Sequence, residues 1–256
     1  MNLLQVLILG IVEGITEFLP ISSTGHLMLT ASVMDLQQTE FLKSFEISIQ
    51  LGAILAVVVL YRRTFSQGWG VWKRVAVAFL PTACIGLLLY KLIKKFLLAS
   101  NEVVLWSLLL GGILLVIFEL LYKEKPGVCD AMDSISYPQS FYIGCFQSLA
   151  MVPGVSRAAA TIVGGLSLGL KRKTIVEFSF LLAVPTMLAA TALDLAKSGS
   201  AFTVRQFFLL CVGFCVSFVV ASAAIKFLLH FIQRHNFIIF GVYRIGIALF
   251  FWFILK

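Results

Sequence analysis

The stretch EGITEFLPISSTGH, residues 13–26, interrupts an apolar segment that begins at Leu3. It carries two glutamates, a proline, hydroxyl side chains, a glycine and a histidine. The apolar runs on either side are each shorter than the roughly 20 residues that cross a bilayer. Irregular backbone at membrane depth is stable only where protein shields it or where it lines a cavity. Residues 3–34 are therefore predicted to form a re-entrant helical hairpin with this stretch at its tip.

The composition predicts an all-α integral membrane protein. The chain has 256 residues, 60% of them hydrophobic and 12% charged, about half the charged fraction of a typical soluble domain. Barrel strands would alternate apolar and polar residues, whereas the apolar runs here are continuous. Six runs predict transmembrane helices, at 45–61, 75–90, 103–122, 175–195, 206–228 and 237–255. We expect one membrane domain over residues 1–256.

The second half of the chain resembles the first. Residues 139–170 repeat the pattern of an apolar run, a polar stretch (PGVSRAAAT, 153–161) and a small-residue run, which predicts a second re-entrant hairpin. Four landmarks recur in the same order: Gly10 with Gly144, Glu13 with Gln147, Ser23 with Ser156, and Glu46 with Glu177. Repeat 1 would span about 1–122 and repeat 2 about 137–256, with a cytoplasmic linker at 123–136. Three crossings per unit make the second copy inverted, an architecture that places binding sites at the repeat interface.

Charge sets the expected orientation. The net charge is +8, but the basic residues flank apolar runs, so membrane topology and anionic lipids explain them and no nucleic acid partner is expected. Lys and Arg are more numerous in the loops at 62–74, 123–136, 171–173 and 226–235. Those loops are predicted to be cytoplasmic, with both termini outside and the hairpins meeting tip to tip. The five cysteines form no CxxC pair and predict neither a disulfide framework nor a zinc site.

The first tip has the groups needed for phosphate chemistry. Glu13 and Glu17 share a helical face, and carboxylates at this depth are a functional hypothesis by default. A hard cation, Mg²⁺ or Ca²⁺, would suit them, and the alternative is that they face water near the interface. One hydroxyl among Ser22, Ser23 and Thr24 would cap the next half-helix, whose N-terminus favours an anion, but capping does not account for all three, and Ser22 and Thr24 are expected to bind substrate. His26 lies within reach of the same pocket.

The second tip is cationic. Gly154 makes the turn, and Ser156, Arg157 and Thr161 follow. Arginine grips phosphate oxygens with two parallel hydrogen bonds and keeps its charge. Arg244, in GVYRIGIAL (241–249), is a further intramembrane cation. It would neutralise a carboxylate such as Glu13 or Glu46, hold a lipid phosphate, or form a structural ion pair. Together the tips suit a metal-bridged phosphate or diphosphate.

These residues resemble a known family, the undecaprenyl-diphosphate phosphatases of the bacitracin-resistance type. EGITEFLPISSTGH matches the family's first motif at every marked position, and PGVSRAAAT resembles the second, usually PGxSRSxxT. The FLLAVP and IQLGAILAVV runs extend the likeness over essentially the whole chain. One departure is Ala158, where the family usually has serine. That position is then not expected to be essential, or its hydrogen bond is replaced elsewhere.

The resemblance implies a multi-pass enzyme of the bacterial cytoplasmic (inner) membrane. It would hydrolyse undecaprenyl diphosphate, recycle the lipid carrier for peptidoglycan and confer bacitracin resistance, with its active site toward the periplasmic side and a divalent cation assisting. By the same resemblance Glu13 and Glu17 are metal ligands or acid–base groups, and Ser23, Ser156 and Thr161 are pocket hydroxyls. His26 is then catalytic, and Arg157 clamps the diphosphate.

Three alternatives remain open at this point. The nucleophile is Ser23, activated by His26 or a glutamate, or else His26 itself or metal-bound water. The runner-up function is a transporter or flippase of an anionic or lipid-phosphate substrate, because inverted repeats are a transporter's architecture. The glycines of GGILL (111–115) permit a homodimer in the bilayer.

Overall fold

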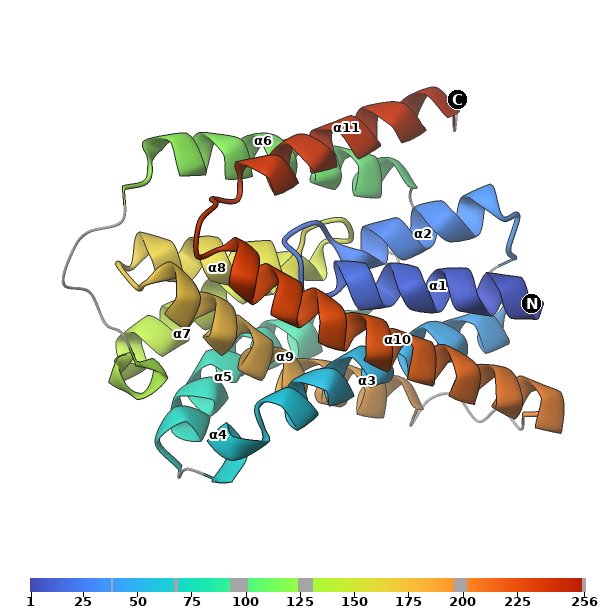
Figure 1. Cartoon of the computed structure of the whole chain (residues 1–256), viewed down its shortest axis with the longest axis horizontal. Coiled ribbons are helices and arrows are strands. Elements are labelled where there is room, and N and C mark those ends of the chain that lie inside the picture. The colour runs from blue at the N-terminus through green and yellow to red at the C-terminus, as the bar shows by residue number, and fades with distance from the viewer. Residues whose placement is uncertain (38, 67–68, 93–100, 124–130, 196–201, 255–256) are drawn as a thin grey trace.

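The computed structural model describes residues 1–37, 39–66, 69–92, 101–123, 131–195 and 202–254, and over these ranges all regular structure is helical (Figure 1). The first half comprises α1 (Leu3–Thr16), α2 (Ser23–Val33), α3 (Glu40–Leu60), α4 (Arg62–Ser66), α5 (Trp69–Leu92) and α6 (Asn101–Leu121). The second comprises η2 (Met132–Ser134), α7 (Tyr137–Ser148), η3 (Leu149–Met151), α8 (Arg157–Ser167), α9 (Arg172–Leu195), α10 (Val204–Phe231) and α11 (Ile238–Ile254). Residues 124–130 of the predicted linker lie outside the described ranges.

Five helices within these ranges are long and apolar enough to cross a membrane: α3, α5, α6, α9 and α10. The prediction of a helical, multi-pass membrane protein is confirmed. The sixth predicted span is the apolar helix α11, whose 17 residues rise about 26 Å at 1.5 Å per residue. The spans α3 and α10 begin before the predicted starts because a capping threonine precedes each apolar run. Thr39, for example, accepts a hydrogen bond from the backbone of Leu42 and starts α3 at Glu40.

Each predicted hairpin is a pair of short helices in contact. In the first, α1 packs against α2, and in the second α7 packs against α8. Helices of 11 to 14 residues extend about 17 to 21 Å, which is less than the roughly 30 Å hydrocarbon core. Figure 1 shows the two pairs entering the molecule from opposite ends. Their turns therefore meet in its interior.

The turns at the two tips depend on unusual backbone geometry. Gly154 has a φ of +87°, and a Cβ there would lie 2.7 Å from the carbonyl oxygen of Val104. Glycine is thus required both by the backbone angle and by the close approach of α6. Ser22, which caps α2, has a φ of +74°. Side chains other than glycine rarely adopt that conformation, and such positions cluster at functional sites.

The long helices pack around the hairpins through small residues. α1 packs on α10 and α7 on α5, while α10 also packs on α3 and α11 on α6. At the α6–α11 contact, a Cβ on Gly112 would lie 2.7 Å from the carbonyl oxygen of Gly241. Glycines allow membrane helices to approach this closely. The glycines of GGILL, which were considered for a homodimer, therefore pack against α11 of the same chain. A homodimer stays a prediction, but these glycines would not form its interface.

Candidate active site

Glu17 lies at the centre of the site, between the two hairpin tips. It is the residue that ends α1, and its carboxylate accepts a short hydrogen bond from the Ser23 hydroxyl at the start of α2. Its other oxygen lies 3.2 Å from Nη2 of Arg157, the first residue of α8. Glu17 and Arg157 are 140 positions apart in sequence, yet Ser23, Glu17 and Arg157 are joined by consecutive hydrogen bonds. The expected convergence of the acidic and cationic tips is therefore present in the geometry.

Arg157 is held by more than its carboxylate. Its Nη1 donates to the backbone oxygen of Ser179 in α9 at 2.9 Å, and its guanidinium lies over the Phe18 ring at 6.0 Å. Its Nε is buried and has no hydrogen-bond partner among the described residues. The side chains of Arg157 and Glu17 are only 10% and 4% exposed. A pair so shielded is weakly screened by salt, and its remaining donor is available to a bound anion.

Glu13 differs from Glu17 in having no donor partner among the described residues, although its carboxyl group lies within hydrogen-bonding reach of that of Glu17. It is fully buried, one helical turn before Glu17, and neither carboxylate oxygen makes a hydrogen bond to a described residue. It interacts electrostatically with Glu17, Glu46 and Arg157. Buried polar groups are almost always satisfied, so these orphaned oxygens point to a bound proton, cation or water.

Glu46 is a nearby acid that the sequence analysis used as a repeat landmark and as a possible partner of Arg244, but not as a site residue. It lies in α3, and its Oε1 is buried without a described partner. An acid inside an otherwise apolar run was the available signal. Within the described ranges, no group of three or more His, Cys, Asp and Glu side chains has a geometry that could hold a metal. A cation would therefore take its remaining ligands from substrate or water.

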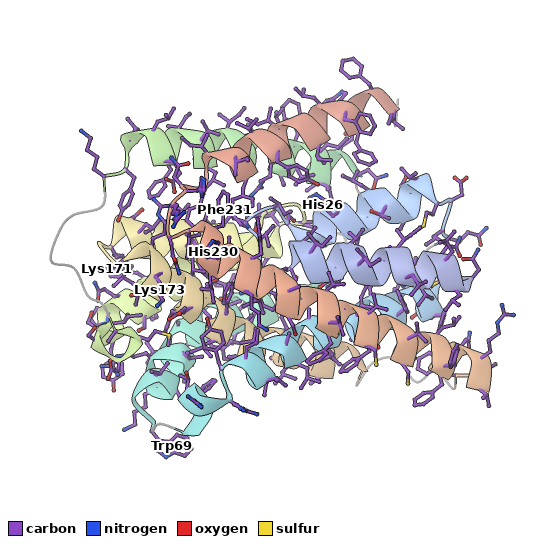
Figure 2. All side chains as sticks on the ribbon, viewed as in Figure 1. His26, Trp69, Lys171, Lys173, His230 and Phe231 are labelled. Carbon is purple, nitrogen blue, oxygen red and sulfur yellow. The ribbon has the colours of Figure 1, made fainter. Side chains whose placement is uncertain are left out.

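His26 faces α11 rather than Ser23. Its Nδ1 lies 2.7 Å from the backbone oxygen of Ser22, and its Nε2 lies 2.9 Å from the Tyr243 hydroxyl. The two rings stack at 5.5 Å with an interplanar angle of 5°. Figure 2 shows His26 in the interior, near the tip of the first hairpin. Two activators were considered for Ser23, His26 and a glutamate. The Ser23 hydroxyl donates its hydrogen bond to Glu17 and not to His26.

Tyr243 was missed by the sequence reasoning. The only available signal was its place beside the singled-out Arg244, since 217 positions separate it from His26.

The other hydroxyls at the tips make local hydrogen bonds. Ser22 and Ser156 cap α2 and α8 by accepting from the backbone of Gly25 and Ala159, and the Ser156 hydroxyl lies 3.4 Å from the carbonyl oxygen of Leu19 in the other tip. Thr161 bonds the hydroxyl of Ser179 at 2.6 Å and the backbone oxygen of Arg157 at 2.9 Å.

Two more residues complete the tips. Thr24 lies half-buried in the first turn of α2, and Ala158, the departure from the family motif, is fully buried in α8.

Arg244 fastens the two tips together. It is 1% exposed, and it donates to backbone oxygens of Pro20 in the first tip (3.4 Å), Gly154 in the second (3.0 Å) and Ser107 in α6 (3.0 Å). Its described partners are thus carbonyls rather than Glu13 or Glu46. The position predicted to neutralise an acid or bind substrate instead holds main-chain oxygens, because the tips present them toward α11.

Comparison with known proteins identifies the family. Residues 6–250 match the family described as "Bacitracin resistance protein BacA". A protein from Aquifex aeolicus named undecaprenyl-diphosphatase is 53% identical over 245 residues, covering 96% of this chain and 95% of its own. Proteins of that name from Sulfurihydrogenibium sp. (52% over 255 residues, 99% and 100% covered) and Wolinella succinogenes (49% over 255 residues, 100% and 99% covered) are also similar. The chain therefore belongs to the BacA family of bacitracin resistance proteins.

Proposed function

We propose that this protein hydrolyses undecaprenyl diphosphate to undecaprenyl phosphate and inorganic phosphate, and thereby recycles a lipid carrier for peptidoglycan synthesis and confers bacitracin resistance. The names of its relatives support the substrate. The observation that carries the proposal is the position of Glu17, which joins the Ser23 hydroxyl of one hairpin to the Arg157 guanidinium of the other. A hydroxyl bound to a carboxylate beside a fixed cation supports phosphoryl transfer, because the carboxylate can accept the proton of the nucleophile and the cation stabilises the transferring group.

Ser23 is the nucleophile in this proposal. Its oxygen attacks the terminal phosphorus, its proton passes to Glu17, and the bond to the bridging oxygen breaks to release undecaprenyl phosphate. Water then cleaves the phosphoserine, giving inorganic phosphate and returning the proton to Ser23. Support comes from the Ser23–Glu17 hydrogen bond and from the involvement of both His26 nitrogens elsewhere. Attack by His26 or by water remains the alternative.

Arg157 clamps the transferring phosphoryl group. Its unpartnered Nε–H would donate a hydrogen bond to a phosphate oxygen, while its terminal nitrogens remain hydrogen-bonded to Glu17 and Ser179. Fixed positive charge at the developing negative charge is the largest contribution a protein makes to this reaction. The hydroxyls of Ser22, Thr24, Ser156 and Thr161 and the turn at Gly154 would shape the pocket around it.

A divalent cation, Mg²⁺ or Ca²⁺, would be held by Glu13 and Glu17. The two unpartnered oxygens of Glu13 are the hard donors that such cations prefer. When bound, the cation would supply positive charge to the diphosphate oxygens. Glu17 already binds Ser23 and Arg157, so Glu13 is the less encumbered ligand.

The membrane arrangement proposed is six spans plus two re-entrant hairpins in an inverted repeat. The reciprocal packing of α1 on α10 and of α7 on α5 supports it, because each hairpin then packs on a span of the other half. Trp69, Lys171, Lys173 and His230, which belong to three of the loops predicted to be cytoplasmic, all lie in the left half of Figure 2. The site would then open toward the periplasmic side of the bacterial inner membrane.

Phosphate release from undecaprenyl diphosphate by the purified protein tests this function. Ser23→Ala, Glu17→Gln and Arg157→Ala should each abolish turnover, while Arg205→Ala, an exposed residue of α10, should not. Near-normal release from a folded Arg157→Ala variant would contradict the clamp. A phosphoenzyme retained in wild type and lost in Ser23→Ala, but not in His26→Gln, would identify the nucleophile.

The same assay separates hydrolysis from transport. The reciprocal hairpin packing is also an architecture of transporters. If the wild-type protein releases no phosphate but moves a labelled lipid phosphate across vesicles, it is a transporter and not a hydrolase.

A further inference from the structure

The two contacts of the His26 ring, with the Ser22 carbonyl and the Tyr243 hydroxyl, indicate which nitrogen carries the proton. A carbonyl oxygen can only accept, so the 2.7 Å contact with the Ser22 backbone places a hydrogen on Nδ1. In the neutral ring Nε2 then has a lone pair, which accepts the Tyr243 O–H at 2.9 Å. The parallel stacking of the two rings restrains the imidazole plane as well.

The Tyr243–His26 pair also connects α11 to the first hairpin beside the fastening made by Arg244. Tyr243 and Arg244 are neighbours in sequence, and their side chains reach His26 and the two tips respectively. His26 is 8% exposed whereas Tyr243 is 42% exposed. The tyrosine thus covers the histidine from the outer surface of the helix bundle. His26 lies one helical turn after Ser23, so a rotation of its ring would change the pocket beside the nucleophile.

We propose that Tyr243 is a positioning residue for the phosphatase reaction: its hydroxyl donates to Nε2 of His26 and its ring stacks on the imidazole, so that the ring plane is fixed at the first hairpin tip while the Ser22 carbonyl sets the Nδ1–H tautomer. This inference rests on the proposed function, because Ser23 is the nucleophile there and His26 lies one helical turn after it in α2. Hydrogen bonds that fix a histidine ring in this way contribute about 10- to 100-fold in comparable metal-site histidines. The effect is expected in kcat, because Tyr243 acts through His26 and not through substrate binding.

The test compares Tyr243→Phe, which keeps the stacked ring and removes only the hydroxyl, with Tyr142→Phe, a half-exposed tyrosine of α7. Nitrogen-15 NMR of the imidazoles in the full chain reports the tautomer directly. The chain has three histidines, and His26→Gln assigns the relevant signal. Steady-state phosphate release gives kcat and KM for the same proteins.

We expect the Nδ1–H tautomer of His26 in wild type, Tyr142→Phe and Tyr243→Phe, because the Ser22 carbonyl sets it, and a shifted Nε2 signal in Tyr243→Phe alone, because that variant loses the hydrogen bond from the hydroxyl. The kcat of Tyr243→Phe should fall about 10-fold or more, with KM within about twofold, and the double variant with His26→Gln should be no slower than His26→Gln alone. An Nε2 signal in Tyr243→Phe that equals the wild-type signal, or an unchanged kcat while His26→Gln is slow, overturns the proposal.

If no variant or wild type releases phosphate, the proposed function fails and the catalytic part of this inference fails with it. The NMR result still decides whether Tyr243 fixes the ring. The two failures are therefore distinguishable.

Discussion

Replacing Arg244 tests whether the active site is held together from outside the hairpins. Arg244→Met keeps a long unbranched side chain and removes the guanidinium that donates to Pro20, Ser107 and Gly154. Hydrogen bonds between membrane helices are worth about 0.6 kcal/mol on average and about 1.7 kcal/mol at most. For the bonds described here, the loss in free energy of unfolding should therefore be about 2 to 5 kcal/mol.

Arg244→Lys separates fastening from charge. A lysine keeps the positive charge, but its single nitrogen cannot reach carbonyls on both tips and on α6. If Arg244 acts by fastening, both variants should unfold more easily and lose kcat by at least about tenfold, the equivalent of about 1.4 kcal/mol. If it acts by attracting diphosphate, lysine should preserve KM and methionine should raise it.

The assay combines unfolding in mixed micelles with phosphate release. Trp106 of α6 and Trp252 of α11 lie edge to face at 4.8 Å, so tryptophan fluorescence reports separation of the helix that carries Arg244. Arg205→Met, on the exposed start of α10, is the control. An Arg244→Met protein with the wild-type unfolding midpoint and only a raised KM would refute the fastening reasoning.

Two further predictions concern residues of the hairpins. Gly154→Ala should cost about 2 to 4 kcal/mol in unfolding free energy, because it adds a left-handed backbone penalty to a collision with Val104. The control is Gly169→Ala, which has a φ of +80° and open space around it and should cost only about 1 to 2 kcal/mol. Equal losses in the two variants would contradict a tight contact at the tip. Glu13→Gln should raise the unfolding free energy by about 1 kcal/mol, because it removes a buried carboxylate that has no described donor partner. It should also abolish the dependence of phosphate release on divalent cation, whereas the exposed control Glu40→Gln should keep that dependence. A Glu13→Gln protein that is still stimulated by cation would contradict the ligand role.

The hairpins could be predicted from sequence because their signals are local. A polar stretch flanked by apolar runs too short to cross a bilayer, present twice, predicted both helix pairs. The same pattern placed Glu17 and Arg157 at the two tips, and the inverted arrangement predicted that the tips would meet. Helix ends were less accurate because caps such as Thr39 extend helices beyond their apolar runs.

The contributions of α11 could not be predicted because they depend on packing. Which side chains of α11 reach the tips is set by the close approach of Gly112 and Gly241, a detail of helix register. Sequence identified Arg244 as a buried cation, but not that it would bind carbonyls. The pairing of His26 with Tyr243 joins segments 217 positions apart, and no local pattern marks it.

The way Arg244 holds the tips affects how the sequence can change. Its acceptors are main-chain oxygens of residues 20, 107 and 154, and every amino acid supplies such an oxygen whatever its side chain. Residue 107 could thus be exchanged for another small residue without loss of an anchoring point. With Gly154 held constant, the other tip side chains could therefore change toward new lipid head groups while Arg244 keeps the two tips aligned.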